Sequence, residues 1–130
     1  MIHAQAEIEL RPTAGPVVTE LTASSRQKWD NFVRQCKQAT FFHLSAWKNI
    51  MEDVFGHRTR FLMAQREGQV VGVLPLVEVK SSLFGHAVVS LPFCVYGGAA
   101  TDDDDASAVL HENAVRFAKG IGAEYLEVRN

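Results

Sequence analysis

Two helix-like patterns follow one another directly, and this order restricts the chain to few folds. Apolar residues recur at helical spacing over 25–37 and again over 45–55, which predicts two amphipathic helices. Ser45 is the expected N-cap of the second helix, and Gly56 is the residue expected to end it. A strand-like segment over 17–21 precedes the pair. We expect the two tryptophans, Trp29 and Trp47, to lie in the core. The apolar positions are Trp29, Phe32, Val33 and Cys36 in the first helix and Trp47, Ile50, Met51 and Val54 in the second.

Strand patterns dominate the remainder of the chain. Alternation over 57–64 and a turn over 66–69 lead into 70–79, which is apolar almost throughout and typical of a buried strand. Pro75 cannot donate a ladder hydrogen bond, so we expect a bulge or a sheet edge there. The other expected elements are a strand over 86–91, a helix from about Asp105 to Gly120 or Gly122, and a last strand over 124–129.

The predicted order is therefore β-α-α-β-β-β-α-β, an α/β (α+β) fold built on a mixed sheet. Residues 1–16 carry charges and prolines with little periodicity, so we expect a loose leader before one domain over 17–130. The last strand has no expected neighbour beyond it, which is unusual for an independently stable domain. We therefore expect an incomplete domain whose exposed sheet favours homodimers.

The composition excludes several classes of function. A net charge of −2, from 13 basic and 15 acidic residues, leaves no basic surplus for binding duplex nucleic acid. The two cysteines, Cys36 and Cys94, are too few and too scattered for a disulfide framework or a zinc site. No signal peptide and no membrane-spanning apolar run is recognisable, so we expect a cytoplasmic protein.

The segment 90–98 is the best candidate for a binding loop. It lies where a strand hands over to a helix, a position from which backbone amides and side chains reach ligands. Gly97 and Gly98 allow close backbone approach, and Phe93 and Tyr96 offer flat apolar surface. We expect these four residues to bind substrate; a tight turn with a packed aromatic side chain is the alternative.

The order of elements resembles the GNAT fold, the N-acyltransferase fold of the acetyl-CoA-dependent acetyltransferases. Seven segments in sequence order also resemble the first half of the FemAB family. They are most similar to its branch associated with exosortase (PEP-CTERM) and exopolysaccharide systems of Gram-negative bacteria. The resemblance corresponds to one of the two modules of a FemAB protein. The segments are Thr40–Trp47, Phe55–His57, Gly72–Leu76, Lys80–Gly85, Ser90–Phe93, Tyr96–Gly98 and Glu124–Arg129.

The resemblance implies transfer of an acyl or aminoacyl group to an amine. FemAB enzymes add amino acids from aminoacyl-tRNA to peptidoglycan precursors. The implied partners are thus an envelope or exopolysaccharide precursor, or another small-molecule substrate, and aminoacyl-tRNA in a full-length protein. Without the second module, the implied enzyme is inactive as this chain. The alternatives are a non-catalytic binding or scaffold module of an exopolysaccharide system and an ordinary acetyl-CoA enzyme.

Four consecutive aspartates, Asp102 to Asp105, argue against coenzyme A as the donor. In the acetyl-CoA-dependent enzymes, the loop after the fourth strand binds pyrophosphate through amides at a helix N-terminus. Carboxylates in that place stabilise the helix dipole but repel a pyrophosphate. We expect a helix cap rather than a metal site, because consecutive residues rarely converge on one ion. We predict no resident cofactor.

Single residues with acid–base or charge chemistry complete the candidates. Among His43, His57 and His86, His57 is the best candidate for a catalytic base, although capping or bridging of backbone groups explains each histidine more simply. Lys80 suits a phosphate or carboxylate of a precursor, or only keeps a turn soluble. Arg129 lies on a polar face of the last strand, where it lines a cleft or forms an ion pair.

Overall fold

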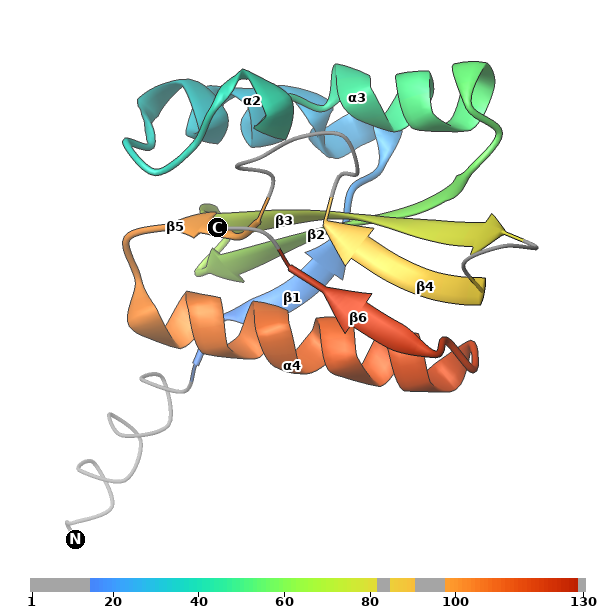
Figure 1. Cartoon of the computed structure of the whole chain (residues 1–130). Coiled ribbons are helices and arrows are strands. Elements are labelled where there is room, and N and C mark those ends of the chain that lie inside the picture. The colour runs from blue at the N-terminus through green and yellow to red at the C-terminus, as the bar shows by residue number, and fades with distance from the viewer. Residues whose placement is uncertain (1–14, 82–84, 91–97, 129–130) are drawn as a thin grey trace, which may run out of the picture.

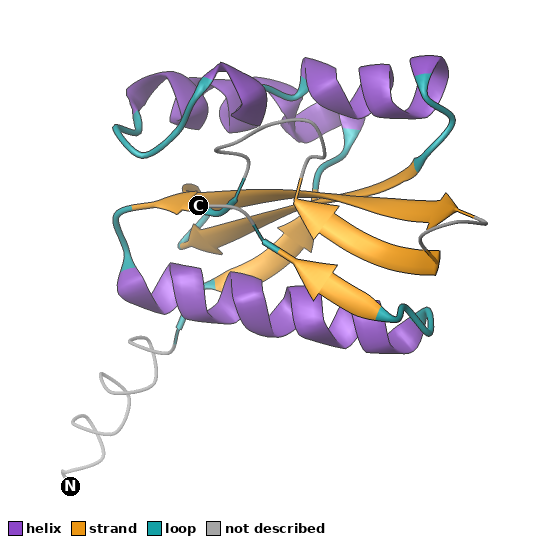
Figure 2. Ribbon diagram, viewed as in Figure 1, coloured by secondary structure: helices purple, strands orange, loops and turns teal. Residues whose placement is uncertain are grey.

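Helices cover both faces of one mixed β-sheet, which gives the molecule three layers (Figure 1). The computed structural model describes residues 15–81, 85–90 and 98–128. Figure 2 shows the helices between β1 and β2 on one face of the sheet and α4 on the other. The predicted class is confirmed, and so is the predicted order of elements, apart from one additional short strand before the last helix. Within the described ranges, no helix is long and apolar enough to cross a bilayer.

The strands run in the order β1-β2-β3-β4-β6 across the sheet, and β5 pairs with β3 beyond the end of β4. Neighbouring strands are antiparallel except β4 and β6, which are parallel. The two-residue strand β5 was not predicted, because so short a strand carries no periodicity. The strands are β1 (Val17–Glu20), β2 (Arg58–Arg66), β3 (Gln69–Ser81), β4 (Gly85–Ser90), β5 (Ala100–Thr101) and β6 (Tyr125–Glu127).

A two-residue turn joins β2 to β3. Glu67 and Gly68 both have positive φ, 50° and 82°, which is the backbone conformation of a type I′ hairpin turn. Arg66 and Gln69 form the first pair of the hairpin ladder. The turn predicted over 66–69 is therefore confirmed, and it sets the register of the two longest strands.

One edge of β3 is interrupted. β4 pairs with β3 from Leu76 onward and β5 pairs with 72–73, so no described residue pairs with Pro75 on this edge. A residue without an N–H is tolerated at such a gap. Of the two alternatives predicted for Pro75, a bulge or a sheet edge, the structure agrees with the sheet edge. The register shift of the β2–β3 ladder lies instead between Ala64 and Gln65.

The helical region between β1 and β2 is divided into short segments. The second predicted helix buries Met51 as expected, but Val54 is 70% exposed. Its last turn is π-helical, and a π-helix has more residues per turn than an α-helix, so Val54 rotates off the buried face. The segments are η2 (Ala23–Ser25), α2 (Arg26–Gln35), η3 (Phe41–His43), α3 (Ala46–Asn49) and the π-helix η4 (Ile50–Val54).

Ser45 occupies the predicted N-cap position of α3 but bonds differently. Its side chain makes no cap hydrogen bond. Its backbone N and its Oγ instead donate to the two carboxylate oxygens of Asp30, at 2.8 and 2.7 Å. This contact ties the start of α3 to α2. Gly56, with a φ of 71°, follows the helical segment and ends it as predicted.

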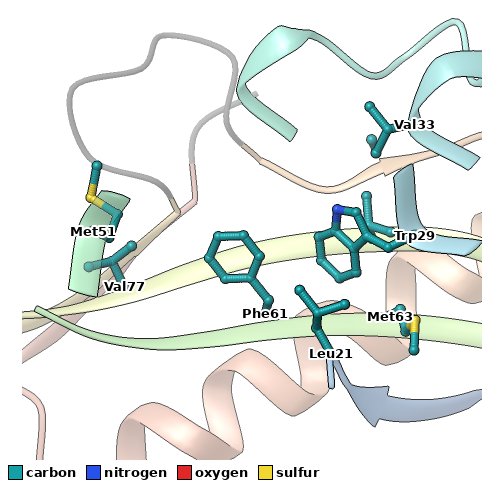
Figure 3. Close-up of a cluster of buried hydrophobic side chains, with 9 residues drawn as sticks. Leu21, Trp29, Val33, Met51, Phe61, Met63 and Val77 are labelled. Atoms are coloured by element: carbon teal, nitrogen blue, oxygen red, sulfur yellow. The ribbon is translucent and has the colours of Figure 1, made fainter. Parts of the chain in front are cut away.

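Large side chains fill the face under α2 and α3 (Figure 3). Trp29 of α2 is fully buried and stacks on Phe61 of β2, with ring centroids 5.4 Å apart. Its Nε1 donates to the carbonyl of His43 at 2.7 Å. Trp47 is partly buried against the edge of the same cluster. The prediction that both tryptophans lie in the core is thus confirmed for Trp29, whereas Trp47 is only partly buried.

The opposite face of the sheet, which includes Leu62, Leu74 and Leu76, packs against α4 (Asp104–Gly120). The buried residues of this helix are mostly alanines, and these small side chains bring the helix close to the sheet. A Cβ placed on Gly72 of β3 would come within 3.0 Å of Thr101 and 3.1 Å of Leu110. Gly122, with a φ of 71°, lies just beyond the last turn, as predicted. The buried residues of α4 are Ala106, Leu110, Ala114 and Ala118.

Candidate functional site

One end of the sheet, at the tip of the β3 arrow in Figure 1, carries polar and charged side chains on three adjacent strands. Arg58 on β2 lies opposite Glu78 on β3, and Lys80 on β3 lies opposite His86 on β4. Directly opposite residues, and residues two apart on one strand, share a face of a sheet. These four residues, together with His57 just before β2, are the sheet-end cluster.

Glu78 is the buried member of the sheet-end cluster, with only 7% of its surface exposed. Its Oε2 accepts a hydrogen bond from His86 Nε2 at 2.5 Å and lies 4.0 Å from Lys80 Nζ. A buried carboxylate is costly unless it is paired and hydrogen-bonded. These two contacts therefore explain how β3 accommodates Glu78, and the first of them fixes the orientation of the His86 ring.

A pocket of about 160 Å³ opens beside Glu78. The ring of His57 stacks on that of Phe55, with centroids 6.4 Å apart, so one face of the imidazole is covered. The structure thus brings together two predicted site residues, His57 and Lys80, that are more than twenty positions apart. Such a pocket offers cationic donors and an imidazole to a small polar group. Its lining consists of Gly56, His57, Arg58, Glu78 and Lys80.

His43 links η3 to the end of the predicted binding loop. The buried ring accepts a hydrogen bond at Nδ1 from the amide of Thr40, at 2.9 Å, and donates from Nε2 to the carbonyl of Gly98, at 2.6 Å. A ring with one accepting and one donating nitrogen is the neutral form of histidine. Burial favours the same form, because it lowers the pKa of His43. The structural role predicted for His43 is confirmed, and Gly98 contributes its carbonyl to this contact.

Backbone amides at the N-terminus of α4 already donate hydrogen bonds to a carboxylate of the same segment. Asp103 is the N-cap, and its Oδ1 accepts from the amides of Asp105 and Ala106 at 2.9 and 3.1 Å. Arg66 donates to Asp103 at 2.8 Å and to Asp105 at 3.2 Å, and its bond holds the pKa of Asp103 below the usual range. The predicted cap is confirmed. In the described part of the chain, no three possible ligands are grouped to hold a metal ion.

A larger pocket, of about 480 Å³, lies between β1, β2 and α4 and was not predicted. The guanidinium of Arg60 lies over the ring of Phe117, 4.6 Å from its centroid, and bonds to Glu20 at 3.0 Å. Arg116 pairs with Glu112 of the next helical turn at 3.3 Å. Because both arginines have carboxylate partners, this pocket offers less to an anionic ligand than the sheet-end cluster does.

Several predicted residues lie outside the described residues, and one important pairing was missed. The missed pairing is that of Glu78 with His86. The sequence contained a signal for it, since Glu78 is the single charged residue within the nearly continuous apolar run 70–79. The predicted substrate-binding residues outside the described ranges are Phe93, Tyr96, Gly97 and Arg129.

No protein-family model matches the sequence, and no curated protein sequence matches it. Solved structures do resemble it. FemX is 21% identical, with a TM-score of 0.60 over 80% of this chain, and the chain spans only 24% of FemX. A ribosomal-protein-alanine N-acetyltransferase from Brucella melitensis biovar Abortus 2308 is 13% identical, with a TM-score of 0.62 over 88% of this chain and 80% of its own.

A GNAT family acetyltransferase from Staphylococcus aureus subsp. aureus USA300_TCH1516 is also similar, at 9% identity and a TM-score of 0.62, covering 90% of this chain and 87% of its own. Identities this low show the fold alone. The chain therefore has a GNAT-like fold, as predicted. Membership of the FemAB family and association with PEP-CTERM systems stay predictions.

Proposed function

We propose that this chain is an acyltransferase or aminoacyltransferase module that acts on an amine of a cell-envelope or exopolysaccharide precursor. The observation that carries this proposal is the GNAT-like fold, which FemX and two acetyltransferases share. Because the chain spans about a quarter of FemX, we propose that activity requires further parts of a longer polypeptide.

The proposed donor is an aminoacyl group, carried by aminoacyl-tRNA, rather than an acyl group on coenzyme A. A pyrophosphate at the start of α4 would need the helix amides that Asp103 already accepts from. It would also have to compete with Asp103 and Asp105 for Arg66. Both kinds of competition disfavour binding of coenzyme A at the start of α4 and support a donor without a helix-bound pyrophosphate.

The proposed acceptor site is the loop that ends at Gly98. Its support is the bond between His43 and the carbonyl of Gly98, which anchors the end of this loop to the α2–α3 layer. We propose that Phe93, Tyr96 and Gly97 contact the acceptor, and that Arg129 also binds it.

His57 is the proposed base that removes the proton of the attacking amine. It lies at the end of the sheet where β4 starts, whereas the loop that ends at Gly98 follows the end of β4. We therefore propose an extended acceptor that reaches from this loop to the sheet end, where its amine meets His57. The support for His57 is its position on the rim of the pocket at the sheet end. Its ring forms no side-chain hydrogen bond within the ranges that the structure covers, so no such bond there competes for its nitrogens.

A transfer assay on the intact gene product tests the proposal. Radiolabelled aminoacyl-tRNA and radiolabelled acetyl-CoA are each incubated with amine-bearing peptidoglycan or exopolysaccharide precursors. We expect transfer from aminoacyl-tRNA and none from acetyl-CoA. The substitution His57→Gln should lower kcat by about 10²–10⁴-fold, whereas His111→Gln on α4 should leave kcat unchanged.

Three results would contradict parts of this proposal. Thermal stabilisation by coenzyme A, or product from acetyl-CoA alone, would overturn the assigned donor. Full activity of the His57→Gln variant would remove His57 from the mechanism. Binding of the precursor without product from any donor would favour the non-catalytic scaffold module over the transferase.

Homodimerisation is proposed through the edge of β6. Its support is that β6 stands last in the strand order β1-β2-β3-β4-β6 of the described residues, and strands at the end of a sheet are the ones that pair with a second chain. Size-exclusion chromatography with light scattering should give twice the chain mass of 14.4 kDa. A concentration-independent monomer would count against the dimer.

A further inference from the structure

We propose that the pocket of the sheet-end cluster binds a small oxyanion, the phosphate or carboxylate group of a ligand, through Arg58 and Lys80. This inference does not rest on acyl transfer, because it concerns binding alone and is measured without any donor. Three features of the pocket carry it: its two cations without a close carboxylate partner, the way its one carboxylate is held, and its size.

The two cations lack close partners. Arg58 forms no ion pair or side-chain hydrogen bond with any residue in the described part of the chain. Lys80 is 69% exposed and comes no nearer than 4.0 Å to Glu78. By contrast, Arg60 and Arg66 each meet a carboxylate at 3.0 Å or less. The donors at the sheet end are therefore available to a ligand, and charge-assisted hydrogen bonds to an oxyanion are among the stronger ones.

Glu78 does not cancel these cations. Its carboxylate is buried, and its Oε2 is held by His86 at 2.5 Å. With a neutral His57, the lining of the pocket carries two positive charges and one negative charge, which leaves a net positive charge in a chain whose total is −2. Such a local reversal of sign attracts anions to this end of the molecule.

The dimensions of the pocket fit a small group. Its volume of about 160 Å³ is below the roughly 300–1,000 Å³ of pockets that enclose drug-sized ligands. A phosphate or a carboxylate fills that space, whereas a nucleotide or a sugar would extend out of it. A metal ion is not favoured, because the lining has more cationic groups than carboxylates and a metal ion needs anionic or neutral ligands.

Nuclear magnetic resonance of the ¹⁵N-labelled 130-residue chain tests this site directly. Sodium phosphate and sodium acetate are titrated separately at constant ionic strength and pH, and the amide shifts of residues 57, 58, 78 and 80 are followed. We expect saturable shifts at these amides with a millimolar dissociation constant. Saturation by phosphate alone assigns a phosphate ligand, and saturation by both ions assigns a general oxyanion site.

A double variant and a matched control separate a site from general attraction. The double substitution Arg58→Gln and Lys80→Gln should weaken binding at least tenfold, and both residues are exposed, so the fold should be kept. The double substitution Arg116→Gln and Lys119→Gln removes the same charge from α4 and should change the affinity by less than twofold.

Two results would overturn the oxyanion site. The first is the absence of saturable shifts for both ions in the folded wild-type chain. The second is an equal loss of affinity in both double variants, which would show that only the net charge of the protein attracts the ions. Neither result bears on acyl transfer, so failure here is distinguishable from failure of the proposed function.

Discussion

The two faces of the sheet are packed in different ways. Under α2 and α3, large side chains such as Trp29, Phe61 and Met51 fill the space between the layers, and a tryptophan N–H reaches a backbone carbonyl. Under α4, three buried alanines let one long helix lie close to the strands. Packing on the first face thus depends on the volume of large side chains, and packing on the second face depends on the short distance between α4 and the strands.

This difference reflects what covers each face. The first layer consists of short helical segments joined by irregular backbone, so side chains must bridge it to the sheet. Asp30 connects α2 to the start of α3 by hydrogen bonds, and His43 connects η3 to the carbonyl of Gly98. The second layer is a single helix of 17 residues that satisfies its own backbone. Large-to-small changes should therefore harm the first face most, and small-to-large changes the second.

The largest expected effect is that of Trp29→Ala. The substitution removes a fully buried ring and leaves a cavity against Phe61, so we expect the free energy of unfolding to fall by about 3–5 kcal/mol. Chemical denaturation measures it. Trp47→Ala is the matched control, and because Trp47 is only partly buried, it should cost clearly less. Equal losses would contradict the larger contribution assigned to Trp29 on the ground of its complete burial.

On the second face, Ala114→Leu should destabilise by overpacking. Ala114 is fully buried between α4 and the sheet, so we expect a loss of about 1–3 kcal/mol. Ala108→Leu on the exposed side of the same helix should stay within about 0.5 kcal/mol of the wild type. A neutral Ala114→Leu variant would mean that α4 is not held close to the strands.

A smaller effect is expected where α4 begins. Asp103→Ala removes the N-cap and the partner of Arg66, and loss of such a cap typically costs about 1 kcal/mol. Asp102→Ala removes a neighbouring exposed carboxylate that does not cap the helix, so it should cost much less. If the two variants were equally stable, the cap hydrogen bonds would not contribute to the stability of this layer.

The smallest effect is a dependence of stability on pH in the first face. Because burial lowers the pKa of His43 in the folded chain, the unfolded chain takes up this proton first as the pH falls. The contribution of the neutral ring is therefore complete above the unfolded pKa of about 6.5 and is lost as the pH falls below it.

Denaturation midpoints between pH 7.5 and 5 measure this dependence. The slope should shrink in His43→Gln and persist in His57→Gln, which keeps the buried ring. An unchanged slope in His43→Gln would exclude His43 as its source.

Local patterns in the sequence predicted most of the fold. The apolar spacing of α2 and α4, the turn at 66–69 and the cap at Asp103 involve residues within a few positions of one another, and each is confirmed. The wrong prediction for Val54 also has a local cause. Val54 was placed on a buried face because a π-helical turn has no simple sequence signature.

The candidate site was less predictable, because its contacts join distant segments. The histidines were recognised as candidates, but neither the bond from His43 to Gly98, 55 residues away, nor the one from His86 to Glu78 could be read from spacing. The residues that carry acid–base chemistry are visible in a sequence, whereas their partners depend on which strands become neighbours.

By itself, the sequence determined the type and order of the helices and strands, because the periods of 3.6 and 2 residues are properties of the local backbone. Only the tertiary structure decided that β4 and β6 pair in parallel, that β4 and β5 share one edge of β3, and that five polar residues meet at one end of the sheet. These arrangements follow from the crossing of the chain over the sheet, where packing and hydrogen bonds between distant segments choose the neighbours.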